Sequence, residues 1–187
     1  RAGREKGWTS DGIPDVRIEQ VTEPSEESIE KAAEHGIAFV SQPIFPYAES
    51  ASYLANLGAE RIKQCYPFRH ILEKGVQLGF STDAPATFWA VPSDPFPGLK
   101  LAVTRTAADG TDCGRQEAVD IETAVTLYTR GAALAAGFPD IGMLAPGYRA
   151  AFAVLRDDLI RVPPEQNDQV QGAATYPSAD VVYRPDR

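Results

Sequence analysis

One stretch, residues 75–85 (GVQLGFSTDAP), constrains the fold more than any other. Val76–Phe80 is a short apolar run that begins directly after a glycine, which is typical of a buried strand. The run ends in Ser-Thr-Asp, and Pro85 then prevents a regular continuation. A strand that ends at a carboxylate places that group at the edge of the sheet where parallel α/β proteins bind ligands. Asp83 is therefore the first candidate for a catalytic residue. The alternative is that its carboxylate only caps the next turn.

The segments before Asp83 alternate between strands and helices. Asp15–Val21 alternates with a period of two, and Ile37–Val40 is a continuous apolar run, so both are predicted strands. A helix is expected between them, beginning after residues 22–27 (TEPSEE) and ending at Gly36. A proline-punctuated loop is expected over Ile44–Tyr53, followed by a second helix from Pro67 to Gly75. This order indicates a parallel sheet or a β/α barrel.

After Asp83 the pattern becomes less regular. Four prolines between residues 85 and 97 predict a long irregular loop, and loops of that kind are usually functional. A short helix is expected over Leu99–Arg105, and another that Asp120 caps and that Arg130-Gly131 breaks. Ala151–Leu155 is a predicted strand, the tail from Pro163 is polar, and Asp180–Tyr183 is a candidate edge strand.

Composition excludes some functions. The chain has 187 residues, enough for one domain with a core, and a formal net charge of −8, which disfavours nucleic acid and anionic membranes as partners. No apolar run approaches a membrane span, so a soluble, cytoplasmic protein is expected. The two cysteines, Cys65 and Cys113, are far apart in sequence and weakly favour a reducing compartment.

Several of these segments together resemble one enzyme family. The strongest signals are Ser81–Pro85 (STDAP), Thr129–Ala132 (TRGA) and the entry to the last strand at residues 142–147. They resemble the C-terminal half of YtcJ-like metal-dependent hydrolases in the amidohydrolase superfamily, near imidazolonepropionase and N-substituted formamide deformylase. From Asp15 onward, nearly the whole chain takes part in the resemblance.

The resemblance implies an α/β fold, namely the C-terminal part of a (β/α)8 TIM-like barrel plus part of a small β-sandwich. Residues 1–14 would be the end of a preceding helix and loop, 15–140 the barrel part with strands six to eight, and 141–187 the sandwich segment and tail. Only three of the eight strands are present, so the rest of the barrel is expected in the same or another chain. The complete protein would act on a small-molecule substrate, and a homo-oligomer is one further expectation.

The resemblance also implies a chemistry, the hydrolysis of an amide or cyclic amide carbon–nitrogen bond with the help of one or two divalent ions, expected to be zinc. Asp83 matches the family aspartate that binds the metal and relays a proton to the departing nitrogen. Gln20 matches a histidine that binds the metal at the end of strand six, and an amide is a weaker zinc ligand than an imidazole. A non-catalytic or regulatory relative that has lost its metal is therefore the alternative function. A doubly wound sheet is the alternative fold.

For several other residues, an ordinary structural role is the alternative to a functional one. Arg105 follows the long loop and is a candidate substrate contact, with a surface salt bridge as the alternative. His35 and His70 match no ligand position of the family, and Cys113 has no nearby histidine to activate it. Phe88 and Trp89, close behind Asp83, either wall a substrate pocket or pack under the loop.

Overall fold

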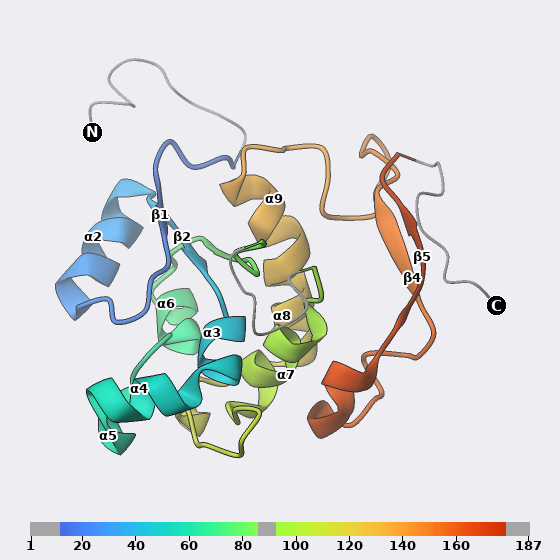
Figure 1. Cartoon of the computed structure of the whole chain (residues 1–187). Helices are drawn as coiled ribbons and strands as arrows, with labels where there is room; N and C mark the ends of the chain where they lie inside the picture. Colours follow the sequence, from blue (N-terminus) through green and yellow to red (C-terminus); the bar gives the residue numbers. More distant parts are fainter. Residues whose placement is uncertain (1–11, 86–92, 179–187) are drawn as a thin grey trace.

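The computed structural model describes residues 12–85 and 93–178 of the chain. Its centre is a three-stranded parallel sheet in the order β1 (Arg17–Glu19), β2 (Ala38–Ser41) and β3 (Leu78–Phe80) (Figure 1). Ile18 pairs with Phe39, and Val40 pairs with Gly79. The predicted α/β pattern and the order of its strands are confirmed, although each strand is shorter than, or shifted slightly from, its predicted range.

Helix α2 (Glu26–His35) connects β1 to β2, as the sequence predicts. Ser25 caps its first turn, because the Ser25 hydroxyl accepts a hydrogen bond from the backbone N–H of Ser28 at 3.2 Å. Gly36 ends the helix with φ +65°, a conformation that costs glycine little. Ile29 is buried on the face that packs against the core.

The connection from β2 to β3 is helical where a loop was predicted. It contains α3 (Ile44–Ala48), α4 (Ser50–Leu57), α5 (Ala59–Ile62) and α6 (Phe68–Glu73). The expected loop over Ile44–Tyr53 is therefore wrong. Pro43 precedes α3 and Pro46 lies in its first turn, where backbone N–H groups have no partner within the helix, so neither proline prevents the helix from forming.

Helix α7 (Phe96–Thr104) is the next described helix after β3, and the 3-10 turn η1 (Arg115–Glu117) follows α7. A longer helical stretch then consists of α8 (Ile121–Thr126), the π-helical segment η2 (Leu127–Gly131) and α9 (Ala132–Ala135). The N-cap role of Asp120 is confirmed, because its carboxylate accepts from the Thr123 N–H at 2.7 Å.

The predicted break at Arg130-Gly131 is wrong. Gly131 has helical angles (φ −60°, ψ −48°), and a π turn carries the chain through. A Cβ added to Gly131 would lie 2.4 Å from the backbone oxygen of Leu78, so the glycine allows the helix to approach β3 closely. The residue therefore serves helix–strand packing and does not end the helix.

A two-stranded antiparallel ribbon lies on the far side of α7 from the parallel sheet (Figure 1). It pairs β4 (Phe152–Leu155) with β5 (Gly172–Tyr176), and the Phe152 and Tyr176 rings stack at 4.6 Å. The sequence predicted β4 but not β5, which lies in the polar tail, or the 3-10 helix η3 (Pro164–Gln169) before it. The candidate strand Asp180–Tyr183 lies outside the described residues.

The core lies between the parallel sheet, α6 and α7. Its aromatic members make consecutive ring contacts, with centroids 4.7 Å apart for Phe68 and Phe80 and 5.3 Å apart for Phe80 and Tyr128. The ribbon is tied to this core through η3, because Asp168 accepts hydrogen bonds from Tyr47 and Lys100, each at 2.9 Å. Among the described residues, no helix has the length and apolar character needed to cross a membrane.

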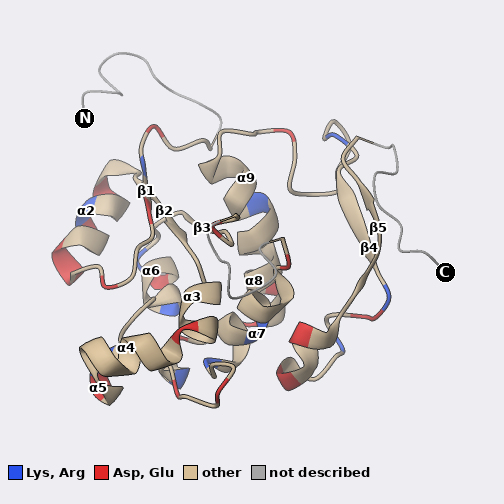
Figure 2. Ribbon diagram, in the orientation of Figure 1, with Lys and Arg blue, Asp and Glu red and all other residues tan. Residues whose placement is uncertain are grey.

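The described part of the chain carries charged residues of both signs on many of its elements (Figure 2). Figure 2 shows Lys and Arg scattered over several elements, with Asp and Glu between them. Many of these charges pair locally, as Arg61 does with Glu23 at 2.9 Å. Exposed pairs of this kind contribute little to stability.

Candidate functional site

The carboxyl ends of the three parallel strands meet at one edge of the sheet. Gln20 directly follows β1, Gln42 directly follows β2, and Asp83 comes three residues after β3. Because the strands are parallel and adjacent, these side chains start from the same edge even though they are far apart in sequence. The edge is therefore the candidate site.

Asp83 and Gln20 are in direct contact across this edge. The Gln20 side-chain Nε2 donates a hydrogen bond to Asp83 Oδ2 at 3.2 Å. Asp83 is half-buried and Gln20 is exposed. Both residues have φ +56°, which is uncommon for residues other than glycine and is concentrated at functional sites. The structure thus brings together two of the three residues that the sequence predicted for the site.

Gln42 is a member of this edge that the sequence reasoning missed. Its side chain is only 2% exposed, and its Nε2 donates to the hydroxyl of Ser81 at 2.9 Å. Gln42 Oε1 is buried and has no hydrogen-bond partner among the residues that the structure describes. A signal is present in the sequence, since Ser41-Gln42-Pro43 ends a strand as Ser81-Thr82-Asp83 does.

Arg105 does not belong to the site, and its predicted role as a substrate contact is corrected here. The residue is 0% exposed, and its guanidinium donates to the backbone oxygens of Cys65, Tyr66, Cys113 and Gly114 at 2.5–3.2 Å. Burial lowers the pKa of Arg105, and the guanidinium also lies 5.1 Å from the centre of the Phe68 ring. A side chain enclosed in this way cannot meet a substrate, so Arg105 is a structural residue.

The remaining candidates lie apart from the edge. His35 is in the last turn of α2, and His70 on α6 lies 2.6 Å from a carboxylate oxygen of Glu26. The Cys113 thiol is buried, and burial raises its pKa, which disfavours the reactive thiolate. Phe88 and Trp89 lie outside the described residues.

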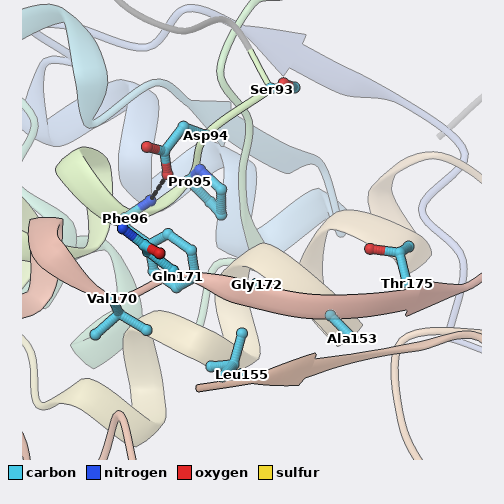
Figure 3. Close-up of a pocket in the computed structure, with 10 residues that line it drawn as sticks. All are labelled: Ser93, Asp94, Pro95, Phe96, Ala153, Leu155, Val170, Gln171, Gly172 and Thr175. Atoms are coloured by element: carbon cyan, nitrogen blue, oxygen red, sulfur yellow. Dashed lines mark hydrogen bonds between the residues drawn. The ribbon is translucent and has the colours of Figure 1, made fainter. Parts of the chain in front are cut away.

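Two neighbouring cavities lie elsewhere, between α7 and the β4–β5 ribbon, with volumes of about 630 and 430 Å³. Figure 3 shows the larger one, in which Asp94 accepts a hydrogen bond from the backbone N–H of Phe96 at 2.9 Å. Neither cavity is lined by Gln20, Gln42 or Asp83. The cavities are therefore separate from the candidate site.

The donor set at the edge can be tested against a divalent metal. Asp83 offers carboxylate oxygens, which divalent cations bind, and Gln20 offers an amide oxygen. In residues 12–85 and 93–178, no group of three or more His, Cys, Asp or Glu side chains is arranged so that it could hold a metal ion. Catalytic zinc usually has three protein ligands. Asp83 thus fits as one ligand, but these residues alone do not complete a metal site.

Comparison with known proteins gives the class of the protein. Residues 2–183 match the amidohydrolase family, and the chain belongs to that family.

Within the amidohydrolase family, the chain is similar to particular members. The chain is 30% identical over 161 residues to YtcJ of Bacillus subtilis (strain 168), a protein assigned as an amidohydrolase. The match covers 84% of this chain and 30% of YtcJ, so the chain spans about a third of its curated relative.

Solved structures agree with this assignment. An uncharacterized metal-dependent hydrolase of Pyrococcus horikoshii is 31% identical with a TM-score of 0.61, over 74% of this chain and 28% of that one. Atrazine chlorohydrolase TrzN of Arthrobacter aurescens, solved with zinc, is 22% identical with a TM-score of 0.65, over 97% of this chain and 38% of TrzN. At that identity TrzN informs the fold alone. These neighbours indicate an α/β fold related to the TIM barrel.

Proposed function

We propose that this chain is the C-terminal part of a metal-dependent hydrolase that cleaves an amide or cyclic amide carbon–nitrogen bond. The observation that carries the proposal is the position of Asp83, a half-buried carboxylate at the carboxyl edge of a parallel sheet in a chain of the amidohydrolase family. In this proposal β1, β2 and β3 are barrel strands six, seven and eight.

Asp83 would bind the metal and relay one proton. A divalent cation, when bound, supplies a nucleophile at neutral pH by acidifying water and polarises the scissile carbonyl. The Asp83 carboxylate accepts the proton that the attacking water releases and passes it to the leaving nitrogen as the carbon–nitrogen bond breaks. Gln20 holds Asp83 Oδ2 through its amide and so orients the carboxylate.

The remaining metal ligands would come from the rest of the barrel, in the same or another chain. The free side of β1 supports this proposal, because all three β1 residues are exposed and Ile18, an apolar residue, is 46% exposed. In the described part of the chain, β1 pairs only with β2 and is exposed on both faces. Such a strand is unusual, since helices normally cover both faces of a parallel sheet. The share of YtcJ that the chain covers points the same way.

The test uses the intact protein that contains this chain, purified with its native metal. We expect about one or two equivalents of zinc by elemental analysis and hydrolysis within a panel of amide and cyclic amide substrates. Asp83→Asn should lower kcat by about 10²- to 10⁴-fold, the usual contribution of a positioned acid–base group. Asp157→Asn, at an exposed aspartate between β4 and η3, is the matched control and should retain full activity.

The alternative function is a non-catalytic relative, and the Gln20–Asp83 contact favours it, because the amide N–H occupies an oxygen that a cation would otherwise bind. In that case the intact protein would contain no stoichiometric metal, and Asp83→Asn would leave its properties unchanged. Metal at full occupancy together with an inactive Asp83→Asn variant would exclude this alternative.

A further inference from the structure

Four non-glycine residues in the described part of the chain have a positive φ: Gln20, Tyr66, Asp83 and Arg105, at 55–56°. Each of these conformations costs about 1–3 kcal/mol and persists only where the surroundings enforce it. Two of the residues form the candidate site, and the other two lie in the interior. Hydrogen bonds connect all four, with Thr22 between Gln20 and Tyr66.

Tyr66 is bound to the chain that leaves β1 at two points. Its backbone N–H donates to the carbonyl of Thr22 at 2.7 Å, and its hydroxyl lies 3.1 Å from the Thr22 hydroxyl. The Thr22 hydroxyl is also 3.3 Å from the carbonyl oxygen of Gln20. The segment that carries Gln20 out of the sheet is thus held by one buried residue.

Tyr66 is itself fixed from the other side. Arg105 Nη1 donates to the Tyr66 carbonyl at 3.1 Å, and Arg105 Nη2 donates to the neighbouring Cys65 carbonyl at 2.7 Å. The Tyr66 ring is 0% exposed and lies 6.0 Å from Phe68, centre to centre. Arg105, which the sequence suggested as a substrate contact, therefore reaches the site only indirectly, because Tyr66 and Thr22 lie between it and Gln20.

We propose that Tyr66 is a positioning residue that holds the exit of β1 so that the Gln20 amide meets Asp83. The inference rests on the proposed function only in treating Asp83 as the reacting carboxylate. The phenol is suited to this task because its ring is anchored in the core while its hydroxyl reaches Thr22. Phenylalanine would preserve the packing of the ring and lose only the hydroxyl contacts.

The fold offers a matched control for this hydroxyl. Tyr53 on α4 shares a 2.7 Å hydrogen bond with the Tyr66 hydroxyl, and the Thr22 side chain also interacts with the Tyr53 hydroxyl. Tyr66→Phe removes both contacts of the Tyr66 hydroxyl, whereas Tyr53→Phe leaves the contact between Tyr66 and Thr22 in place. The difference between the two variants therefore reports on the Tyr66–Thr22 contact.

The experiment measures amide hydrogen exchange by mass spectrometry in the intact protein, in the peptide that covers residues 18–24. Tyr66→Phe should make exchange in this peptide about fivefold faster, as expected for the loss of one hydrogen bond. Thr22→Val should have the same effect, the double variant should exchange no faster than either single variant, and Thr22→Ser should restore protection. Tyr53→Phe, which keeps the Tyr66–Thr22 contact, should speed exchange in this peptide less than Tyr66→Phe does.

Kinetics add a second readout. Because the contact orients a reacting group and does not bind substrate, Tyr66→Phe should lower kcat several-fold with KM unchanged, whereas Tyr53→Phe should lower kcat less. Equal exchange in the two tyrosine variants, or additive effects of Tyr66→Phe and Thr22→Val, would overturn the proposal. If Tyr66→Phe does not fold, the Thr22→Val and Thr22→Ser pair decides by the same exchange measurement. If the intact protein hydrolyses nothing, the proposed function fails while the exchange result still decides this inference.

Discussion

Replacing Arg105 by methionine should destabilise the protein strongly, although Arg105 has no carboxylate partner among its hydrogen bonds. Its guanidinium donates to four backbone carbonyls in the interior. The carbonyls of Tyr66 and Gly114 also accept from the N–H groups of Phe68 and Glu117, so they keep a partner in the variant. In the described part of the chain, the carbonyls of Cys65 and Cys113 accept hydrogen bonds from Arg105 alone.

These contacts determine how much stability Arg105→Met is expected to lose. Each buried carbonyl left without a partner costs about 1–3 kcal/mol, which gives roughly 2–6 kcal/mol for two. Methionine removes a buried charge, and the energy needed to bury that charge offsets part of this loss. The expected decrease in the free energy of unfolding is therefore about 2–4 kcal/mol. Arg105→Lys should recover only part of it, because an ammonium group cannot span the same set of carbonyls.

The assay is equilibrium unfolding in urea, followed by circular dichroism, with Arg61→Met as control. Arg61 also makes two hydrogen bonds, both to Glu23, but its side chain is 60% exposed, so its removal should cost no more than about 1 kcal/mol. Equal losses of unfolding free energy in the two arginine variants would refute this role of Arg105, as would a loss below about 1 kcal/mol for Arg105→Met. In either case, the buried guanidinium would not stabilise the contact between residues 65–66 and residues 113–114.

Two further predictions concern packing and pH. Gly131→Ala should lower the free energy of unfolding by more than about 2 kcal/mol, because the new Cβ would lie 2.4 Å from the Leu78 backbone oxygen. Gly172→Ala is the control, since a Cβ at Gly172 would have no described atom within 4 Å. Equal stability of the two variants in urea unfolding would contradict this account. Burial, and then the hydrogen bond to Asp168, raises the pKa of Tyr47 from 10.0 to about 12, so the folded protein keeps this proton longer than the unfolded chain does. The contribution of Tyr47 to stability is complete below pH 10 and is lost as the pH rises towards 12; Tyr47→Phe should therefore lose less stability than the parent over that window, and parallel curves would disprove the effect.

The features that could be predicted from the sequence are those that local chemistry determines. Ser25 and Gly36 bound a helix because a hydroxyl cap and a left-handed glycine act within a few residues. Asp120 caps α8 for the same reason. Strand order followed from the short helix-to-strand turns, which permit few arrangements. Asp83 reached the sheet edge because the strand before it is buried and the chain cannot continue regularly after it.

The features that could not be predicted depend on distant partners. Residues 172–176 (GAATY) have a weak strand pattern, and they form β5 because β4 pairs with them. From its sequence context Arg105 is expected at the surface, but the fold surrounds its guanidinium with four backbone carbonyls from two other segments. Loop Ile44–Tyr53 was expected from its prolines, whose effect depends on whether they fall in the first turn or the interior of a helix.

The candidate site combines both kinds of feature. The sequence places Gln20 and Asp83 at strand ends, which is local information, but it does not show that Gln20 turns towards Asp83. That turn requires an unfavourable φ at each residue, and such a conformation persists only when other contacts outweigh its cost. The structure supplies one such contact at the exit of β1, where Thr22 is held by Tyr66. We therefore expect the geometry of the Asp83 carboxylate to depend on the core behind the sheet as well as on the strand that carries it.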